Sequence, residues 1–206
     1  MKILAICRGK PEILAGKSYK TGINKVPVGG AVLVDREGLV GDTICNRKHH
    51  GGPDQAIYVE GAMDLSRWAE ELGRPVPPGQ FGENLTIEGL ENGILAVGDR
   101  LRIGEVVLEV TAPRIPCATF AARMDDPSFV KRYTKAARPG AYCRVIAPGV
   151  LTTDQTVEYL PYQGERLTLR EMMVAYGKTH SREALTRFLR APLAERFRKA
   201  LEAKSL

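Results

Sequence analysis

Short apolar runs separated by glycine and proline dominate the first 160 residues of this 206-residue chain. Such runs, rich in β-branched side chains and bounded by turn formers, are typical of β-strands. The predicted strands span residues 3–7, 31–34, 55–59, 100–103, 105–111, 142–146 and 156–160. This spacing predicts a mainly β fold, organised as a β-barrel with peripheral helices.

Two stretches within this part follow a helical period instead. Residues 63–72 place Leu65, Trp68 and Leu72 on one face, and Gly73 follows as a stop signal. A shorter helix is predicted near residues 127–135. We expect both helices to cover the ends of the barrel.

The pattern becomes helical after Leu160. Thr168 and Glu171 have the spacing of a capping box, Ser181 can cap a second helix, and Pro192 suits the first turn of a third. We therefore predict a barrel domain at residues 1–160 and a small C-terminal three-helix appendage at residues 165–206.

Composition and charge narrow the class of protein. Hydrophobic residues make up 44% and charged residues 26%, as in ordinary globular domains. The net charge is +6, but residues 165–206 hold ten Lys and Arg against five Asp and Glu, so the basicity belongs mainly to the appendage. This distribution argues against nucleic acid as the main partner. Without a membrane-length apolar run, a signal-peptide core or a CxxC pair, the chain is expected to be cytoplasmic, with reduced thiols and no membrane association.

A thiol bracketed by prolines carries the strongest chemical signal. Cys117 follows a predicted strand through a segment that contains Pro113 and Pro116. Because the prolines fix φ and remove two backbone donors, no helix is expected to cover the thiol. Arg114 lies three residues away and could stabilise the thiolate, the form that attacks or binds metal. On these residues alone, a buried structural cysteine is an equal alternative.

A glycine pair next to a histidine is a candidate anion site. His50 precedes Gly51 and Gly52, whose open amides can form a nest for an oxyanion such as phosphate. A plain turn between two strands explains the same residues. A zinc site that combines Cys45, His49, His50 and Cys117 is disfavoured, since no second pair has regular spacing.

Two further segments offer polar contacts. Asn84 carries amide donors and an acceptor in a loop, and Arg138 stands at a tight turn that leads to Tyr142 and suits a bidentate phosphate contact. A surface turn with a solvated arginine is the alternative. The chain has neither a Walker loop nor a Gly-x-Gly-x-x-Gly after a strand, which disfavours an ATPase or a nicotinamide enzyme.

Seven segments, taken in order, resemble one family. They are TGINKVPV (21–28), GLVGD (38–42), HGGPDQA (50–56), FGENL (81–85), VGD (97–99), PRIPC (113–117) and GAYCRV (140–145). Their order is similar to that of the MOSC domain, and most similar to its YiiM-like branch. The resemblance covers residues 1–160, and the tail resembles the three-α appendage of the same branch.

The resemblance implies a β-barrel that binds the molybdenum cofactor (molybdopterin), with Cys117 as the thiolate ligand of molybdenum. It also implies reduction of N-hydroxylated bases or amines. The cofactor-binding residues would be Lys25, His50, Gly51, Gly52, Asn84, Arg114, Arg138 and Tyr142. Asp42, His50 or Asp54 could supply a proton.

Partners and rival functions follow from the same residues. Because the chain has no flavin motif and no iron–sulfur spacing, electrons would come from an external donor such as a flavodoxin- or ferredoxin-like protein. The alternative is a persulfide carrier that passes sulfur from Cys117 to the cofactor or a related small molecule. A non-enzymatic RNA-binding barrel draws only on the charge of the appendage and ranks last.

Overall fold

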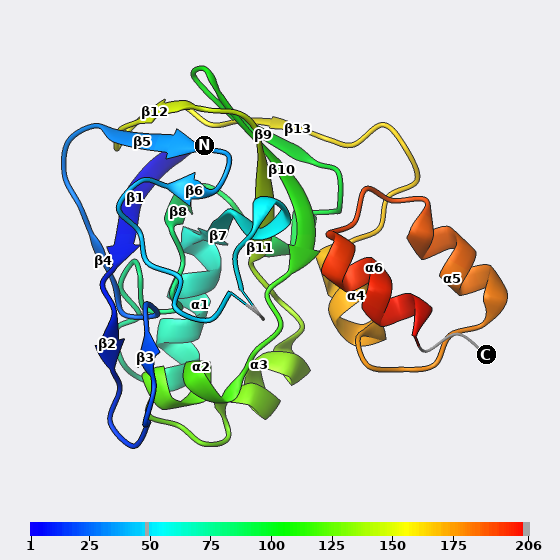
Figure 1. Cartoon of the computed structure of the whole chain (residues 1–206), viewed down its shortest axis with the longest axis horizontal. Coiled ribbons are helices and arrows are strands. Elements are labelled where there is room, and N and C mark those ends of the chain that lie inside the picture. Colours follow the sequence, from blue (N-terminus) through cyan, green and yellow to red (C-terminus); the bar gives the residue numbers. More distant parts are fainter. Residues whose placement is uncertain (48–49, 204–206) are drawn as a thin grey trace.

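The computed structural model describes residues 1–47 and 50–203, and an eight-stranded sheet is its main feature (Figure 1). Neighbouring strands are antiparallel except β7 and β8, which are parallel and joined through helix α1, Ala62–Leu72. The sheet order is β13 (Glu158–Leu160), β9 (Arg100–Ile103), β10 (Val106–Pro113), β11 (Ala141–Ala147), β7 (Ile57–Gly61), β8 (Leu85–Glu88), β1 (Lys2–Gly9) and β4 (Lys25–Pro27). Six of the seven predicted strands are therefore confirmed in this sheet within a few residues, and the seventh, predicted at residues 31–34, is confirmed as Val32–Asp35 in a smaller sheet.

Smaller sheets flank this one. Three strands pair in the order β12 (Gly149–Leu151), β5 (Val32–Asp35) and β6 (Gly38–Leu39), and a short hairpin pairs β2 (Glu12–Ile13) with β3 (Lys20–Thr21). The sequence did not predict β2, β3, β4, β6, β8 or β12, because most of them are too short to give a period.

The predicted closed barrel is not confirmed, although the fold is dominated by its sheets. In the part of the chain that the structure describes, no ladder joins the end strands β13 and β4. The segment before β13 instead meets the start of β1, through a bridge between Lys2 and Thr156 and a hydrogen bond from the Ile3 amide to the Gln155 carbonyl at 3.0 Å. The edge strand β4 is short and contains Pro27, which has no amide to donate to a further ladder.

Three helices and an aromatic cluster cover one end of the main sheet. Helix α1 ends at Gly73, whose φ of 62° gives the left-handed cap that was predicted. Helix α3, Phe129–Ala136, confirms the second predicted helix, whereas α2, Ala118–Arg123, was not predicted. Their shared core consists largely of buried rings, those of Trp68, Phe81, Phe120, Phe129 and Tyr133.

The three predicted C-terminal helices are present as α4 (Leu169–Ala175), α5 (Arg182–Leu189) and α6 (Glu195–Glu202). The capping box is confirmed, because Thr168 Oγ1 accepts from the Glu171 amide at 3.1 Å while Glu171 accepts from the Thr168 amide. Ser181 accepts from the Ala184 amide and caps α5 as predicted. The placement of Pro192 is wrong: α6 begins at Glu195 with Ala194 as its N-cap, so the proline lies in the connection before the helix.

The helical appendage packs on the main sheet. Leu169, Met172 and Phe197 belong to the same buried cluster as the residues of β10, and the Ala194 amide donates to the Thr111 carbonyl at 3.0 Å. The two units of the predicted division therefore share one hydrophobic core. Within residues 1–47 and 50–203, every helix is too short or too polar to span a lipid bilayer.

Candidate functional site

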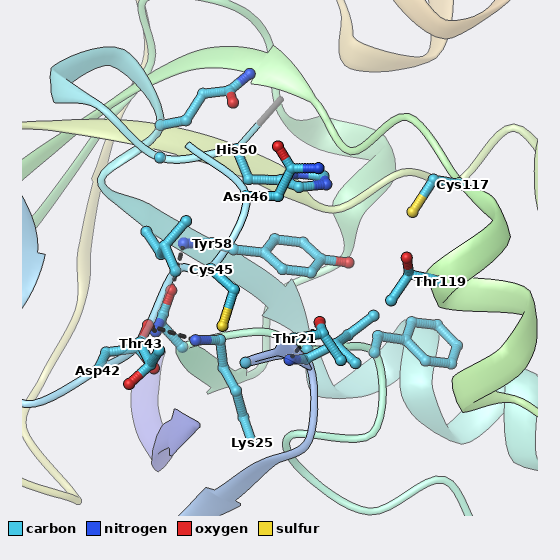
Figure 2. Close-up of a pocket in the computed structure, with 18 of the residues that line it drawn as sticks. Thr21, Lys25, Asp42, Thr43, Cys45, Asn46, His50, Tyr58, Cys117 and Thr119 are labelled. Carbon is cyan, nitrogen blue, oxygen red and sulfur yellow. Dashed lines mark hydrogen bonds and ion pairs between the residues drawn. The ribbon is translucent and has the colours of Figure 1, made fainter. Parts of the chain in front are cut away.

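An open pocket with a cavity volume of about 140 Å³ brings most of the predicted site residues together (Figure 2). The predicted residues that line it are Lys25, Asp42, His50, Gly51, Asn84, Arg114, Cys117 and Tyr142. Three predicted residues do not line it, namely Gly52, Asp54 and Arg138.

The Cys117 thiol is strongly acidified. Burial alone would raise its pKa, but a hydrogen bond from His50 and the positive charge of Arg114 outweigh burial and lower the pKa from about 9 to about 5. The Phe120 amide acts in the same direction. Cys117 is therefore a thiolate at neutral pH, and its partial exposure leaves it open to the pocket.

Local sequence explains the position of this thiol. Strand β10 ends at Pro113, the Arg114 amide donates to the Gly140 carbonyl at 2.9 Å, and Cys117 follows in an extended conformation. As expected, no helix covers the thiol, which lines the pocket, but helix α2 begins directly after it with Cys117 as its N-cap. The prolines forbid a helix only up to Pro116, and the alanine-rich residues that follow are helix formers.

Arg114 is held between aromatic rings. It is 3% exposed, and its guanidinium carbon lies 4.8 Å from the centre of the Phe120 ring and 5.8 Å from that of Tyr58. One guanidinium nitrogen donates to the Ile115 carbonyl, and another lies 4.0 Å from the Cys117 sulfur. These contacts hold the buried positive charge of Arg114 close to the thiolate of Cys117.

His50 stands on the same side of the pocket. Its Nδ1 lies 3.4 Å from the Tyr142 hydroxyl. Gly51 and Gly52 follow with φ of 72° and 80°, which only glycine adopts without strain. A Cβ on Gly51 would also meet Ile44 at 2.8 Å. The glycine pair therefore places His50 at the pocket, while Gly52 itself caps the short helix η1, Pro53–Gln55.

Lys25, Asp42 and Asn84 form a different arrangement in the same pocket. Lys25 pairs with Asp42, and both side chains are less than one-tenth exposed. Asp42 also accepts from the Asn84 side-chain amide at 2.9 Å and from the Gly9 backbone amide at 2.8 Å. The predicted residues are thus in the pocket, but the positive charge of Lys25 already has a counterion.

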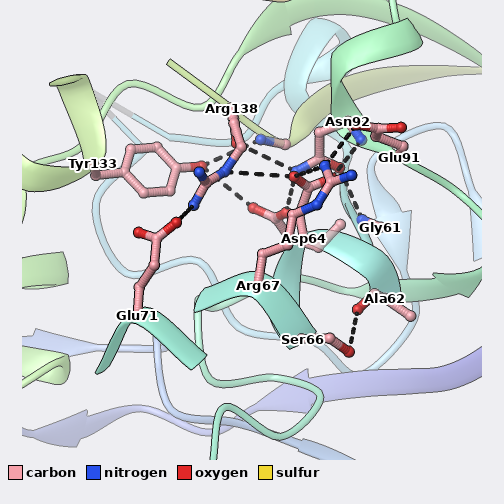
Figure 3. Close-up of polar contacts among 12 residues, drawn as sticks. Gly61, Ala62, Asp64, Ser66, Arg67, Glu71, Glu91, Asn92, Tyr133 and Arg138 are labelled. Carbon is pink, nitrogen blue, oxygen red and sulfur yellow. Dashed lines mark hydrogen bonds and ion pairs between the residues drawn. The ribbon is translucent and has the colours of Figure 1, made fainter. Parts of the chain in front are cut away.

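Asp54 and Arg138 have other partners. Asp54 pairs with Arg144 at 2.9 Å and accepts from the Glu195 amide, so it anchors the start of α6. Arg138 pairs with Glu71 at 2.7 Å and its guanidinium carbon lies 4.7 Å from the centre of the Trp68 ring (Figure 3). The structure therefore does not bring either residue to the pocket.

Sequence reasoning missed several residues that line the pocket. Tyr58, Cys45, Tyr19 and Thr119 all face it, and the Tyr19 hydroxyl lies 2.8 Å from Thr119 Oγ1, which ties the β2–β3 hairpin to α2. The only sequence signal for Tyr58 was its position as an aromatic residue within the strand predicted at residues 55–59. His49, part of the disfavoured zinc set, lies outside the described residues.

Comparisons with known proteins agree on one family. The MOSC domain model matches residues 46–158. YflK of Bacillus subtilis (strain 168) is 36% identical over 166 residues, which cover 80% of this chain and 75% of YflK. YiiM of Escherichia coli (strain K12) is 32% identical over 164 residues, 76% of this chain and 67% of YiiM.

Two further similarities concern function and fold. A protein named reductase from Gibberella moniliformis (strain M3125 / FGSC 7600) is 29% identical over 154 residues, 71% of this chain but 27% of that longer protein. The crystal structure of YiiM from Geobacillus stearothermophilus has a TM-score of 0.82 at 25% identity and covers 98% of each chain. The structural match therefore includes the helical appendage.

Proposed function

Because this chain belongs to the MOSC domain family and to its YiiM-like branch, we propose that it is a molybdenum-cofactor-dependent reductase of N-hydroxylated bases or amines. The observation that carries the proposal is the acidified Cys117 thiolate in a pocket that also holds His50 and Arg114. The similarity to a protein named reductase supports the same class of reaction.

The residues of the pocket fit such a cofactor. A thiolate is a soft ligand and suits a sulfur-bound transition metal, so Cys117 would be the metal ligand. His50, Gly51 and Asn84 line the pocket and would contact the pterin and its phosphate. Lys25 would contribute less charge than the sequence suggests, since Asp42 neutralises it. When bound, the cofactor would supply two-electron redox chemistry.

The surrounding side chains narrow the choice of proton donor. Asp42 already accepts from three donors, those of Lys25, Asn84 and Gly9, and Asp54 lies outside the pocket. Of the three predicted candidates, only His50 both lines the pocket and contacts Cys117. We therefore assign His50 as a donor to substrate or cofactor oxygen.

An acidic flavodoxin- or ferredoxin-like protein would supply the electrons. The appendage offers fewer free cations for it than the sequence suggests, because Arg187 pairs with Glu165 and Glu171, and Lys199 pairs with Glu195. Arg182 and Arg190 are exposed on α5 and at its end. A turnover rate that falls with added salt, for a protein donor but not for a chemical reductant, would support this partner.

A persulfide carrier is the second candidate function. It is favoured by the same observation, since a thiolate with a pKa of about 5 can accept and pass on sulfur without any metal. It differs in requiring neither molybdenum nor a reductant.

Expression in cells able and unable to make the cofactor separates the two functions. We expect molybdenum in the purified protein and reduction of N-hydroxylaminopurine only from the first cells, with Cys45→Ser as a control that keeps both and Cys117→Ser as a variant that loses both. Protein that lacks molybdenum from both sources, yet carries a transferable persulfide on Cys117, would overturn the reductase and support the carrier.

A further inference from the structure

A buried carboxyl group lies directly behind the pocket. Glu60, on β7, is 0% exposed. Its Oε1 atom contacts the Tyr58 hydroxyl and lies 3.3 Å from that of Tyr133, and its Oε2 accepts from the Asn92 side-chain amide at 2.5 Å. In the described part of the chain, no cationic side chain lies within ion-pair distance of Glu60.

The backbone at Gly140 leaves room for this carboxyl group. A Cβ at Gly140 would meet Glu60 Oε1 at 2.5 Å, so glycine leaves the space that the carboxyl occupies. Figure 3 shows Tyr133 and Asn92, two of its partners, near Arg138 and Asp64. Nothing in the reaction described above uses this group.

Glu60 is protonated at neutral pH. Burial raises its pKa to about 8, in spite of the hydrogen bonds from Tyr58 and Asn92, and the negative charges of Glu83 and Asp64 act in the same direction as burial. The other titratable neighbour, Tyr133 on α3, contributes only a neutral hydroxyl, which also accepts from the Gly140 amide at 3.2 Å.

Tyr58 connects the carboxyl group to the pocket. It lines the pocket, and its ring points toward the region that holds Cys117 and Thr119 (Figure 2). A phenol has one hydrogen to donate. When Glu60 is ionised, Tyr58 donates to it; when Glu60 is an acid, it can donate to the Tyr58 oxygen instead, which frees the phenol hydrogen for the pocket.

We propose that Tyr58 and Glu60 form a proton-delivery pair, in which Tyr58 protonates the oxygen that leaves the substrate nitrogen and recovers a proton from Glu60. This inference rests on the proposed reductase function. Reduction of an N–OH group takes two electrons and two protons, breaks the N–O bond and releases an amine and water. The electrons come from the external donor, one proton comes from the pair, and the other comes from His50, which lines the same pocket. Solvent in the open pocket then returns a proton to Glu60 through the Tyr58 hydroxyl, ready for the next turnover.

The test compares Glu60→Gln and Tyr58→Phe with Tyr133→Phe, a matched control that contacts the same carboxyl oxygen but does not line the pocket. Cofactor-loaded proteins reduce N-hydroxylaminopurine with a chemical reductant from pH 5.5 to 9.5. In parallel, infrared spectroscopy follows the carboxylic acid band that Glu60→Gln removes. We expect Glu60→Gln and Tyr58→Phe to lose about 10²-fold in turnover at neutral pH, and only Tyr133→Phe to keep the wild-type decline in rate above about pH 8.

Each outcome separates the two proposals. If the wild-type protein turns over but Glu60→Gln keeps its rate and pH profile, or if no carboxylic acid band is present at pH 7, the proton-delivery pair is overturned and the reductase stands. If the wild-type protein contains molybdenum and shows no turnover at any pH, the reductase is overturned, and the pair with it.

Discussion

The two sides of the pocket differ in how their charges are balanced. On the Cys117 side, formed by Arg114, Cys117, His50 and Tyr142, the buried guanidinium faces aromatic rings and the thiolate. On the Lys25 side, formed by Lys25, Asp42 and Asn84, the ammonium and the carboxylate are paired and hydrogen-bonded.

The difference shows where reactivity can arise. A cation that already has a buried carboxylate partner does little for a third group, whereas a buried cation without a carboxylate partner can stabilise a nearby anion. The acidified Cys117 is the result on one side, and a rigid frame is the result on the other. Both sides carry charged residues, but only the Cys117 side lowers the pKa of a reactive thiol.

Cys117→Ser should have the largest effect. A hydroxyl is a harder and far less acidic ligand than a thiol, so turnover should fall by more than about 10³-fold and molybdenum should be lost. Metal analysis and N-hydroxylaminopurine reduction measure both effects. Cys45→Ser, which changes the other thiol of the pocket, is the control and should keep both properties. Normal turnover by Cys117→Ser would place the reactive side elsewhere.

Lys25→Ala should destabilise the protein by about 3–5 kcal/mol, because it leaves Asp42 buried without its partner. Urea unfolding of the cofactor-free protein measures this change. The paired variant Lys25→Met with Asp42→Asn should recover much of the loss, since no buried charge remains. Unchanged unfolding but weakened cofactor retention would mean that Lys25 serves the ligand rather than the frame.

Alkylation of Cys117 should titrate with a midpoint near pH 5. The thiolate is the nucleophile, so labelling is slow below the pKa, rises as pH passes through it and then levels off. In His50→Ala the pKa should rise, and the rate at pH 5 should fall by about tenfold for each unit of that rise. Peptide mass spectrometry distinguishes Cys117 from buried Cys7 and Cys143, whose pKa values are raised by burial. A midpoint near pH 9 would remove the contrast between the two sides.

Arg138→Ala should have the smallest effect on the pocket. Its partners are Glu71, the Trp68 ring and the buried Asp64, which keeps Arg67 and the Asn92 amide as partners. We therefore expect a loss of about 1–2 kcal/mol of stability and unchanged cofactor retention. Equilibrium unfolding and measurement of bound molybdenum check the two parts. Loss of cofactor without loss of stability would return Arg138 to the anion site that its sequence context predicts.

Local sequence determined the features that neighbours along the chain can fix. Thr168 and Glu171 cap α4 because the two partners lie one helical turn apart. Cys117 and Arg114 come together because only Ile115 and Pro116 separate them along the chain. Seven of the strands follow from short apolar runs. The family was predictable because seven local motif segments keep their order along the chain.

Only the tertiary structure decided which charged residues, distant along the chain, form ion pairs and which do not. Asp42 meets both Lys25 and Asn84, and Arg138 meets Glu71, across separations that no local spacing encodes. The same holds for the sheet, because strand identity is local whereas closure depends on how the edges β4 and β13 lie in space. Glu60 illustrates the limit: a glutamate within a strand has no special pattern, and burial raises its pKa to about 8 in spite of the hydrogen bond from Tyr58. The sequence therefore determined most of the secondary structure and the position of the Cys117 thiol in it. Packing decided which charged side chains can stabilise that thiolate, because electrostatic energies depend on distance and burial rather than on order along the chain.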